Sequence, residues 1–458
     1  MPSHPFDYQI QTNLYSTQEM VSLFSERIRF ERWLEIERAL ARVQGRLGII
    51  PAPAAESIDA TARMDSIDVN VLREEYGKSR NSLIPLIKAL RQACPTEHGE
   101  FVHYGATTQD ILDTSQVLEI RDVFRILYRD LRALESALTT LTIKHRATPM
   151  IGRSHGQQAL PITFGLKTAS WLAEIRRHLE RSKNIYPRIM TGQLSGAVGT
   201  MAALGPNGRE VSRLTLAELG LHSPTIGWHT ARDNIAEAAS FMAMVASSCE
   251  RIAGEVFALA KTETGELNEP ALGTAASSST MPHKRNPVLC QRISVMARHI
   301  RALNLTVTEA MVHEHERDTR ALWSEWLAVP QISIYTGTTL HYINQVISGL
   351  EVDTERMAAN LKLHGDVIMS EWLLFRLGES MGKATAHEAV RRLTGLARSS
   401  GSTLKACIEA DKEISQLLNH EDLARLDHPE TYTGEAAAMI DELLLEVERL
   451  RQKDPREL

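Results

Sequence analysis

The sequence has little cysteine, no long apolar run and no excess of basic residues. Its four cysteines, Cys94, Cys249, Cys290 and Cys407, form no CxxC pair, so we expect reduced, mostly buried thiols in a cytoplasmic protein. The N-terminus lacks the apolar core of a signal peptide, and no apolar stretch of about 18 residues predicts a membrane span. A net charge of −6 argues against general nucleic-acid binding but allows a local basic pocket for an anion.

Motifs of several enzyme classes are also missing. The chain has no glycine-rich loop of the nucleotide-binding type and no GxSxG turn that would carry a nucleophilic serine. The run His313, Glu314, His315 and Glu316 does not have the spacing of an HExxH zinc site. We therefore expect neither a bound metal nor another cofactor.

The dominant pattern that is present is that of long amphipathic helices. Between Thr114 and His145 apolar residues recur at steps of three, four and seven, which places them on one helix face, and Asp113 and Thr114 can cap the helix. No segment alternates clearly enough to predict a strand, so the expected fold class is all-α. Four further long helices are expected at about 161–185, 234–267, 287–313 and 323–350.

Several of these helices are apolar around most of their circumference, as in FMAMVASSCERIAGEVFALA (241–260). A helix of this kind must be buried on most sides, and contact with other subunits would bury it. The sequence therefore predicts an obligate oligomer.

Shorter helices are expected on both sides of the long ones. They occupy 19–49, where Gly48 marks a helix end, and the C-terminal tail. A length of 458 residues suggests two or three domains. We expect an N-terminal helical domain (1–110), a central long-helix bundle (111–360) and a C-terminal helical domain (361–458).

Three short, polar, glycine-containing segments stand at the ends of long helices. They are HYGATTQD (103–110), GRSHGQQALPITFG (152–165) and GTAASSSTMPHKRNP (273–287). The third begins with small residues and ends with a cluster of donors directly before a helix start. Such a loop can close over a substrate, and its donors favour a carboxylate, although a surface linker with a basic turn has the same composition.

The first two segments are open to two interpretations. The hydroxyls of Thr107 and Thr108 can bind a carboxylate, or they can only cap the helix that follows. His103 and His155 can each donate a proton to a substrate or serve as structural histidines.

The three segments together resemble the conserved regions of the fumarase/aspartase superfamily. SSSTMPHKRNP (277–287) is similar to its signature loop, and HYGATTQDILDT and GRSHGQQALPITFG are similar to its first and second regions, in the same order over essentially the whole chain. The branch it resembles most holds adenylosuccinate lyases and 3-carboxy-cis,cis-muconate cycloisomerases. The resemblance implies a three-domain subunit with a central bundle of five long helices. It also implies a homotetramer with a twenty-helix core, whose active sites each take the three segments from three subunits.

The resemblance also implies roles for individual residues. Ser279 matches the catalytic base, and Lys284 and Asn286 match residues that bind a substrate carboxylate. A serine hydroxyl is a poor base in water, so loop closure and exclusion of water must activate it. His155 matches the histidine that protonates the leaving group in adenylosuccinate lyases. Further substrate contacts are expected from Tyr15, Arg80, His103, Thr107, Thr108, Gln157 and Gln193.

Two departures from the family pattern concern the substrate. Gln291 stands where the family often has a glutamate that pairs with the acidic histidine, so a cationic His155 would be less stabilised. Leu14-Tyr15 and SRNS (79–82) replace an Arg-Tyr pair and a T-x-H-D segment that help adenylosuccinate lyases bind their nucleotide.

The presence of His155, which can protonate a departing nitrogen, predicts a carbon–nitrogen lyase. It would cleave an N-substituted aspartate, a small substrate with two carboxylates, by β-elimination and release fumarate. Adenylosuccinate lyase of purine biosynthesis and 3-carboxy-cis,cis-muconate cycloisomerase are the alternatives. An inactive structural member of the superfamily is disfavoured because Ser279, Lys284 and Asn286 are all present.

Overall fold

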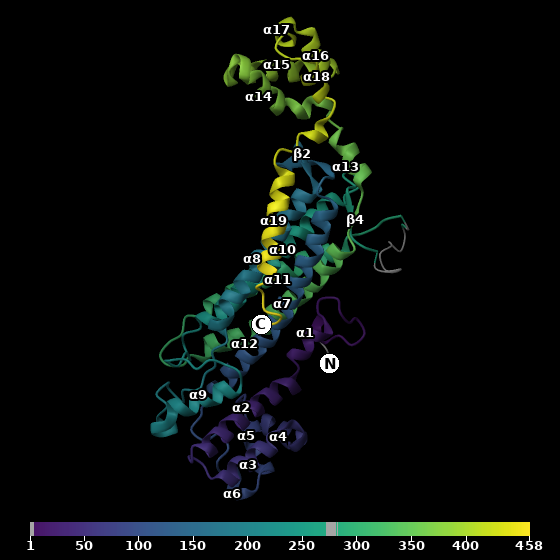
Figure 1. The fold of residues 1–458 in the computed structure, drawn as a ribbon. Helices are drawn as coiled ribbons and strands as arrows, with labels where there is room; N and C mark the ends of the chain where they lie inside the picture. The colour runs from purple at the N-terminus through teal and green to yellow at the C-terminus, as the bar shows by residue number, and fades with distance from the viewer. Residues whose placement is uncertain (1–3, 272–280, 282) are drawn as a thin grey trace.

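The chain is mostly helical and elongated in the computed structural model, which describes residues 4–271, 281 and 283–458 (Figure 1). Within these residues there are nineteen α-helices, and the prediction of a helical fold is confirmed. The helices are α1 (Gln18–Leu23), α2 (Glu26–Arg46), α3 (Ala52–Thr61), α4 (Val69–Lys78), α5 (Ile84–Ala93), α6 (Thr96–Gly99), α7 (Thr108–Lys144), α8 (Phe164–Ile189), α9 (Gly208–Glu218), α10 (Asp233–Leu259), α11 (Val288–Glu309), α12 (Thr319–Ser348), α13 (Thr354–Leu361), α14 (Ser370–Met381), α15 (Lys383–Ser400), α16 (Leu404–Ala410), α17 (Lys412–Ser415), α18 (His420–Arg425) and α19 (Ala436–Arg451).

Long helices form the middle of the molecule. Helices α7, α8, α10, α11 and α12 pack on one another, with the N-terminal helices α2 to α6 at one end and α14 to α18 at the other (Figure 1). Helix α7 has 37 residues, which at 1.5 Å per residue is a length of roughly 55 Å. This helix therefore separates the two ends of the molecule.

The start of α7 differs from the prediction. Asp113 and Thr114 do not cap it, because the helix begins at Thr108 and the Thr107 N–H donates to the Asp110 carboxylate at 3.0 Å. Both residues are instead fully buried inside the helix. They are tolerated there because Asp113 pairs with Arg232 at 2.9 Å and the Thr114 hydroxyl donates to a backbone carbonyl at 2.6 Å.

Two predicted helix ends can be compared with the structure. Gly48 follows α2 with a φ of +67°, the left-handed conformation expected of a glycine that ends a helix. The helix predicted at 234–267 is shorter, because α10 ends at Leu259 and Gly265, at a φ of +64°, turns the chain into a strand.

Two small antiparallel sheets were not predicted. Strands β1 (Pro149–Ser154) and β2 (Gln157–Thr163) form a hairpin between α7 and α8, and β3 (Leu267–Asn268) pairs with β4 (Glu351–Val352). The hairpin was missed because β1 has three consecutive buried residues and so lacks the alternation of a half-buried strand. Both sheets lie at the end of the long helices from which α13 leads to the C-terminal helices (Figure 1).

The core of the described residues has one large part and two smaller parts. The large hydrophobic cluster joins the N-terminal helices to the long helices, a second cluster joins β1 to α13–α18, and a third lies between α2 and α9. Helix α19 returns along α8 (Figure 1). All four cysteines are free and buried, as predicted. None of the helices in the described part of the chain is long and apolar enough to cross a membrane.

Candidate active site

The first polar segment lies at the N-terminal end of α7. His103 adopts a φ of +61°, and its Nδ1 is 2.6 Å from Glu37 Oε1 on α2. Burial by itself would lower the pKa of His103, but the charge and hydrogen bond of Glu37 outweigh it, so the pKa is raised above the ordinary value of 6.5. The pair fixes the ring and stabilises its charged form.

A buried carboxylate holds this segment together. Asp110 accepts hydrogen bonds from the N–H groups of Ser195 and Gly196 at 2.8 and 2.9 Å, and His229 Nε2 lies 3.0 Å away. The Thr107 N–H also donates to Asp110. Asp110 therefore holds the turn at Thr107 and Thr108 next to the loop that contains Ser195 and Gly196.

Gln193 is part of the same structure. Its backbone bonds to the Thr114 hydroxyl, and its side-chain Oε1 accepts from the Trp228 N–H at 3.1 Å. The side chain is 1% exposed, and its Nε2 has no partner among the described residues. The structure therefore brings Gln193 to the predicted site residues of the first segment.

Arg317 and His313 also reach this end of α7, although the sequence did not identify them as site residues. Arg317 Nη2 donates to the Thr107 hydroxyl at 3.2 Å and to the Ala197 carbonyl at 2.8 Å. His313 lies close enough to Arg232 to feel its charge, and burial together with that charge lowers the pKa of His313. A signal was present in the sequence, since HERDTR (315–320) is a dense charged run at the start of α12.

Unpartnered polar atoms are concentrated around this helix end. Buried polar groups nearly always have hydrogen-bond partners, so a cluster of exceptions points to a missing ligand or partner chain. The buried atoms that lack a partner within the described residues include Gln109 Oε1, Asp113 Oδ1, Gln193 Nε2, both ring nitrogens of His313, and Arg317 Nε.

A buried ion network, formed by Arg232, Asp113 and Glu325, lies next to these unpartnered atoms. The Arg232 guanidinium is fully buried and contacts Asp113 at 2.9 Å and Glu325 at 2.6 Å. Burial disfavours the charged form of Arg232, but the two carboxylates outweigh it and raise its pKa. Breaking one partner of such a network is costly because it leaves a buried charge uncompensated.

The second polar segment forms the tip of the β1–β2 hairpin. Ser154 pairs with Gln157, so His155 and Gly156 are the two turn residues, with φ values of +52° and +74°. Two positive φ values are typical of a type I′ turn. The side chains of His155 and Gln157 are both exposed, and Gln157 Nε2 donates only to the Gly156 carbonyl, at 3.5 Å.

A buried ion pair fixes this hairpin to the residue that precedes β3. Arg153 on β1 makes two hydrogen bonds, of 2.6 and 2.9 Å, to Glu266, which is fully buried and also accepts from Asn360 at 2.8 Å. Glu266 immediately precedes β3. The hairpin and β3 are therefore neighbours at one end of the molecule.

The end of the third segment is also fixed by carboxylates. Glu269 accepts from the N–H groups of Leu289 and Cys290 at the start of α11, both at 3.1 Å. Arg285 forms a two-point ion pair with Glu351 at 2.7 Å, and the hydrogen bond from Arg285 lowers the pKa of Glu351. Between these anchors Lys284 is exposed and Asn286 is half-buried. Ser279 lies outside the described residues.

Arg80 and Tyr15 lie elsewhere. Arg80 is exposed in the loop between α4 and α5. Tyr15 is half-buried, next to the backbone of Asn13 and Leu14, which accepts hydrogen bonds from Tyr342 near the C-terminal end of α12. In this chain Tyr15 is thus far along α12 from Arg317, which precedes the helix.

The predicted site residues form two groups at opposite ends of α7. His103, Thr107, Thr108 and Gln193 belong to one end, and the hairpin and the third segment to the other. Roughly 55 Å of helix lies between them. In the described residues no group of three or more His, Cys, Asp or Glu side chains could hold a metal ion.

Comparisons with known sequences and structures identify the class of protein first. The sequence profile described as "Lyase" matches residues 14–302, and the one described as "Adenylosuccinate lyase C-terminus" matches residues 366–443. The protein is therefore a helical enzyme of the lyase class.

Individual relatives agree with the two profiles. An N-acetyl-S-(2-succino)cysteine lyase of Dickeya dadantii is 37% identical over 97% of this chain and 98% of its own. A fumarate lyase of Mesorhizobium sp. BNC1 has a TM-score of 0.88 and 37% identity, covering 94% of this chain and 98% of its own. A 3-carboxy-cis,cis-muconate lactonizing enzyme of Pseudomonas putida has a TM-score of 0.89 and 33% identity, covering 96% and 99%. The chain belongs to the fumarase/aspartase superfamily, as its three polar segments suggested.

Proposed function

We propose that the protein removes fumarate from a succinyl-type substrate by β-elimination. The observation that carries the proposal is the N-terminal end of α7, where Thr107, Thr108 and Arg317 meet beside buried donors that lack a partner in the described chain. A helix N-terminus, hydroxyls and a guanidinium together suit a carboxylate. A succinyl group supplies two carboxylates, of which this end would hold one.

The other half of the proposed site supplies the proton chemistry. Ser279 takes a proton from the carbon next to a carboxylate, and Lys284 and Asn286 hold that carboxylate while its negative charge grows. The electron pair then forms the double bond of fumarate as the bond to the leaving atom breaks. His155 gives a proton to the leaving atom. Overall, one succinyl adduct is converted into one fumarate and one protonated leaving group.

The leaving atom that we propose is sulfur. The relative from Dickeya dadantii is named for N-acetyl-S-(2-succino)cysteine, a thioether of this type. A thiol has a pKa of about 8.5 and departs more readily than an amine, so it demands less of the acid. This agrees with Gln291, an exposed amide, at the position where the family often places a glutamate to support the acidic histidine.

Nitrogen is the second candidate, as an N-substituted aspartate. It is favoured by the presence of His155, since a departing amine needs a proton donor. Adenylosuccinate is one such N-substituted aspartate. The C-terminal profile match supports it as a substrate, but Leu14-Tyr15 and SRNS (79–82) stand in place of segments that help adenylosuccinate lyases bind the nucleotide. A cycloisomerase, like the enzyme from Pseudomonas putida, would consume 3-carboxymuconate and form no fumarate.

The proposal includes a homotetramer whose active sites are shared between subunits. The two groups of site residues lie at opposite ends of α7, and a second copy of the chain could bring one group to the other. Large apolar side chains exposed on the long helices and beside them offer surfaces for such contacts; they include Leu305, Val312, Trp323 and Leu327. Four free cysteines agree with a cytoplasmic location.

A panel of substrates tests the proposed function. The purified protein is offered N-acetyl-S-(2-succino)cysteine, several N-substituted aspartates, adenylosuccinate and 3-carboxymuconate, and fumarate is followed by its ultraviolet absorbance. We expect fumarate from the thioether. Fumarate from the aspartates alone would make nitrogen the leaving atom, and consumption of 3-carboxymuconate without any fumarate would contradict the proposal.

A further inference from the structure

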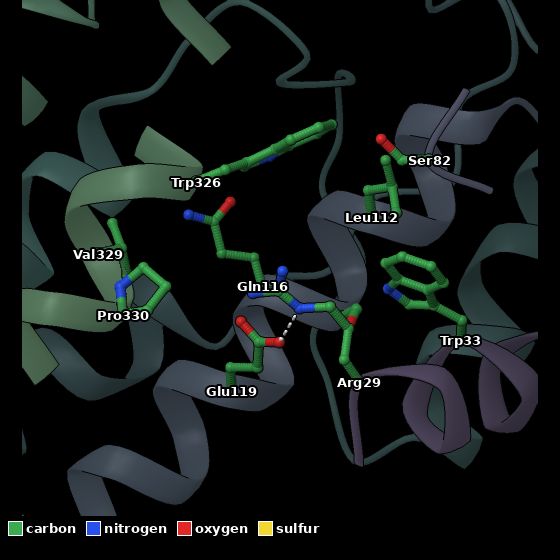
Figure 2. A pocket seen from close by; sticks show the side chains of 10 residues that line it. Arg29, Trp33, Ser82, Leu112, Gln116, Glu119, Trp326, Val329 and Pro330 are labelled. Carbon is green, nitrogen blue, oxygen red and sulfur yellow. Dashed lines mark hydrogen bonds and ion pairs between the residues drawn. The ribbon is translucent and has the colours of Figure 1, made fainter. Parts of the chain in front are cut away.

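A cavity of about 70 Å³ lies between α2, α7 and α12 (Figure 2). Two indole rings, Trp33 and Trp326, stand on opposite sides of it. Arg29 and Glu119 lie together at its base, and the Gln116 side chain points toward Trp326. Such a mixture of apolar walls and a few polar groups is typical of a small-molecule site.

The cavity lies along the same face of α7 as Thr108, on the C-terminal side of the proposed carboxylate site. Thr108 is the first residue of this helix, and Ser115 and Glu119 follow on the same face, about two and three turns further on. A substrate whose succinyl end rests on Thr107 and Thr108 would therefore extend its other end along this face.

The polar groups of the cavity suit a carboxylate at the far end of a small molecule. Arg29 Nε lies 3.3 Å from Glu119 Oε1, and the terminal nitrogens of Arg29 have no partner among the described residues. Burial raises the pKa of Glu119, although the charges of Arg29 and Arg32 oppose this shift. Of the Arg29 nitrogens, only Nε is engaged in a hydrogen bond with the described residues. The guanidinium can therefore take a second anion.

Ser115 provides an independent sign of a ligand. The residue is 1% exposed and lines the cavity, and its hydroxyl has no hydrogen-bond partner in the described part of the chain. An unpaired buried hydroxyl is destabilising, so its retention on the wall of a cavity is explained if a ligand or its bound water satisfies it.

We propose that this cavity binds the leaving half of the substrate and that this half is a small thiol bearing a carboxylate, of amino-acid size. The proposal rests on the proposed function. A cavity needs about 10 to 15 Å³ for each water molecule, so this one holds the equivalent of about five waters. That volume suits the amino-acid side of a thioether better than it suits a nucleotide. The two indoles contact the carbon and sulfur atoms, and Arg29 binds the carboxylate.

Binding of the free leaving half tests the proposal without turnover. N-acetylcysteine is titrated into the full-length protein, and quenching of tryptophan fluorescence reports binding because Trp33 and Trp326 line the cavity. Arg29→Gln should weaken binding roughly tenfold to a hundredfold, since a charge-assisted hydrogen bond is lost. The matched control is Arg27→Gln on the same helix. Arg27 is exposed, so this variant should bind N-acetylcysteine as the wild type does.

Two results would overturn the proposal: equal affinity of Arg29→Gln and the wild type for N-acetylcysteine, or no binding of N-acetylcysteine by the wild type. So would adenosine monophosphate binding with the same dependence on Arg29.

Ser115→Ala provides a second measurement with two opposite effects. Removing an unpaired buried hydroxyl should raise the melting temperature of the ligand-free protein, and the loss of its contact should weaken N-acetylcysteine binding severalfold. A lower melting temperature with unchanged affinity would show that the hydroxyl is structural and would overturn its role as a ligand contact.

The cavity proposal and the proposed function can fail separately. If N-acetylcysteine binding depends on Arg29 but no succinyl substrate yields fumarate, the proposed function is wrong. The proposal that the cavity binds a small thiol with a carboxylate would still hold. If fumarate is released while Arg29→Gln leaves N-acetylcysteine binding unchanged, only the cavity proposal fails.

Discussion

Two histidines of the candidate site have an unusual backbone. His103 and His155 have φ values of +61° and +52°, a left-handed conformation that few residues other than glycine adopt. Such strained residues persist only when the surrounding structure holds them, and they are common at functional sites. For His103 the restraint is visible, because Glu37 fixes its ring from α2.

The His103–Glu37 pair should make stability depend on pH. The pKa of His103 is raised above 6.5 in the folded protein, so its stabilising effect is complete below about pH 6.5 and is lost as the pH rises through the higher folded value. His103→Gln removes this effect. The melting temperatures of the wild type and the variant should therefore differ most near pH 6 and converge toward pH 9. A difference that grows with pH would contradict the assigned direction.

The sequence pointed to some residues of the candidate site and missed others for a physical reason. His103, Thr107 and Thr108 stand in one short segment next to a helix start, so local patterns indicated them. Arg317 is about 210 positions away in the chain and reaches Thr107 only through the packing of α12 against α7. Similarly, Arg29 of α2 contacts Glu119 of α7, which is 90 positions away in the chain. Contacts of this kind follow from the tertiary fold rather than from spacing.

The positions of the long helices could be predicted from the sequence, whereas those of the short strands could not. Apolar periodicity predicted the long helices, because each buries one broad face. It failed at the start of α7, where buried partners allow Asp113 and Thr114 inside the helix. It also failed for the hairpin, whose short strands are defined by pairing with each other and by the turn at His155 and Gly156.

The hairpin turn should be sensitive to substitution of Gly156. An added methyl group meets no atom within 4 Å, so any cost comes from the φ of +74° alone. Gly156→Ala should lower stability by about 1 kcal/mol, and it should reduce turnover by displacing His155. The control is Gly395→Ala in α15, where the helix is regular and the space is also open; there stability should rise by about 0.5 to 1 kcal/mol. Denaturant unfolding and fumarate release measure both effects. Equal stability changes at the two sites would contradict the turn assignment.

The Arg153–Glu266 pair should be essential for joining the hairpin to β3. Glu266 is fully buried, and Glu266→Gln would leave Arg153 without its charged partner. Breaking a buried ion pair on one side typically costs about 3 to 5 kcal/mol. Turnover should fall as well, because the same contact positions His155 relative to the loop that carries Ser279.

An exposed ion pair of similar geometry is the control for that variant. Arg146 contacts Asp441 through two hydrogen bonds, but both side chains are largely in solvent. Asp441→Asn should leave stability and turnover nearly unchanged. If Glu266→Gln behaves like Asp441→Asn in thermal unfolding and in fumarate release, the buried pair does not position the hairpin.

The whole molecule explains why distant segments carry one chemistry. A single helix of roughly 55 Å separates the end of the chain proposed to bind a carboxylate from the end with the hairpin, Lys284 and Asn286. Because no chain can bring its own two ends together across that helix, the complete site is proposed to form between subunits. The exposed apolar side chains on α11 and α12 agree with an assembly of this kind.

Mixing two inactive variants tests this account most directly. Thr107→Val/Thr108→Val damages one end of the site, and Ser279→Ala damages the other. Each variant alone should release fumarate at least a hundredfold more slowly than the wild type. Loss of the proton-transfer group Ser279 costs about 10² to 10⁴, and loss of two hydroxyl hydrogen bonds to a charged carboxylate costs about 1.5 to 3 kcal/mol each, a similar factor. When equal amounts are dissociated and reassembled together, about a quarter of the sites should combine two intact ends, if the subunits mix at random. Recovery of about a quarter of the wild-type rate is the predicted result. A rate no higher than that of the separate variants would show that each chain builds its own site and would contradict the account.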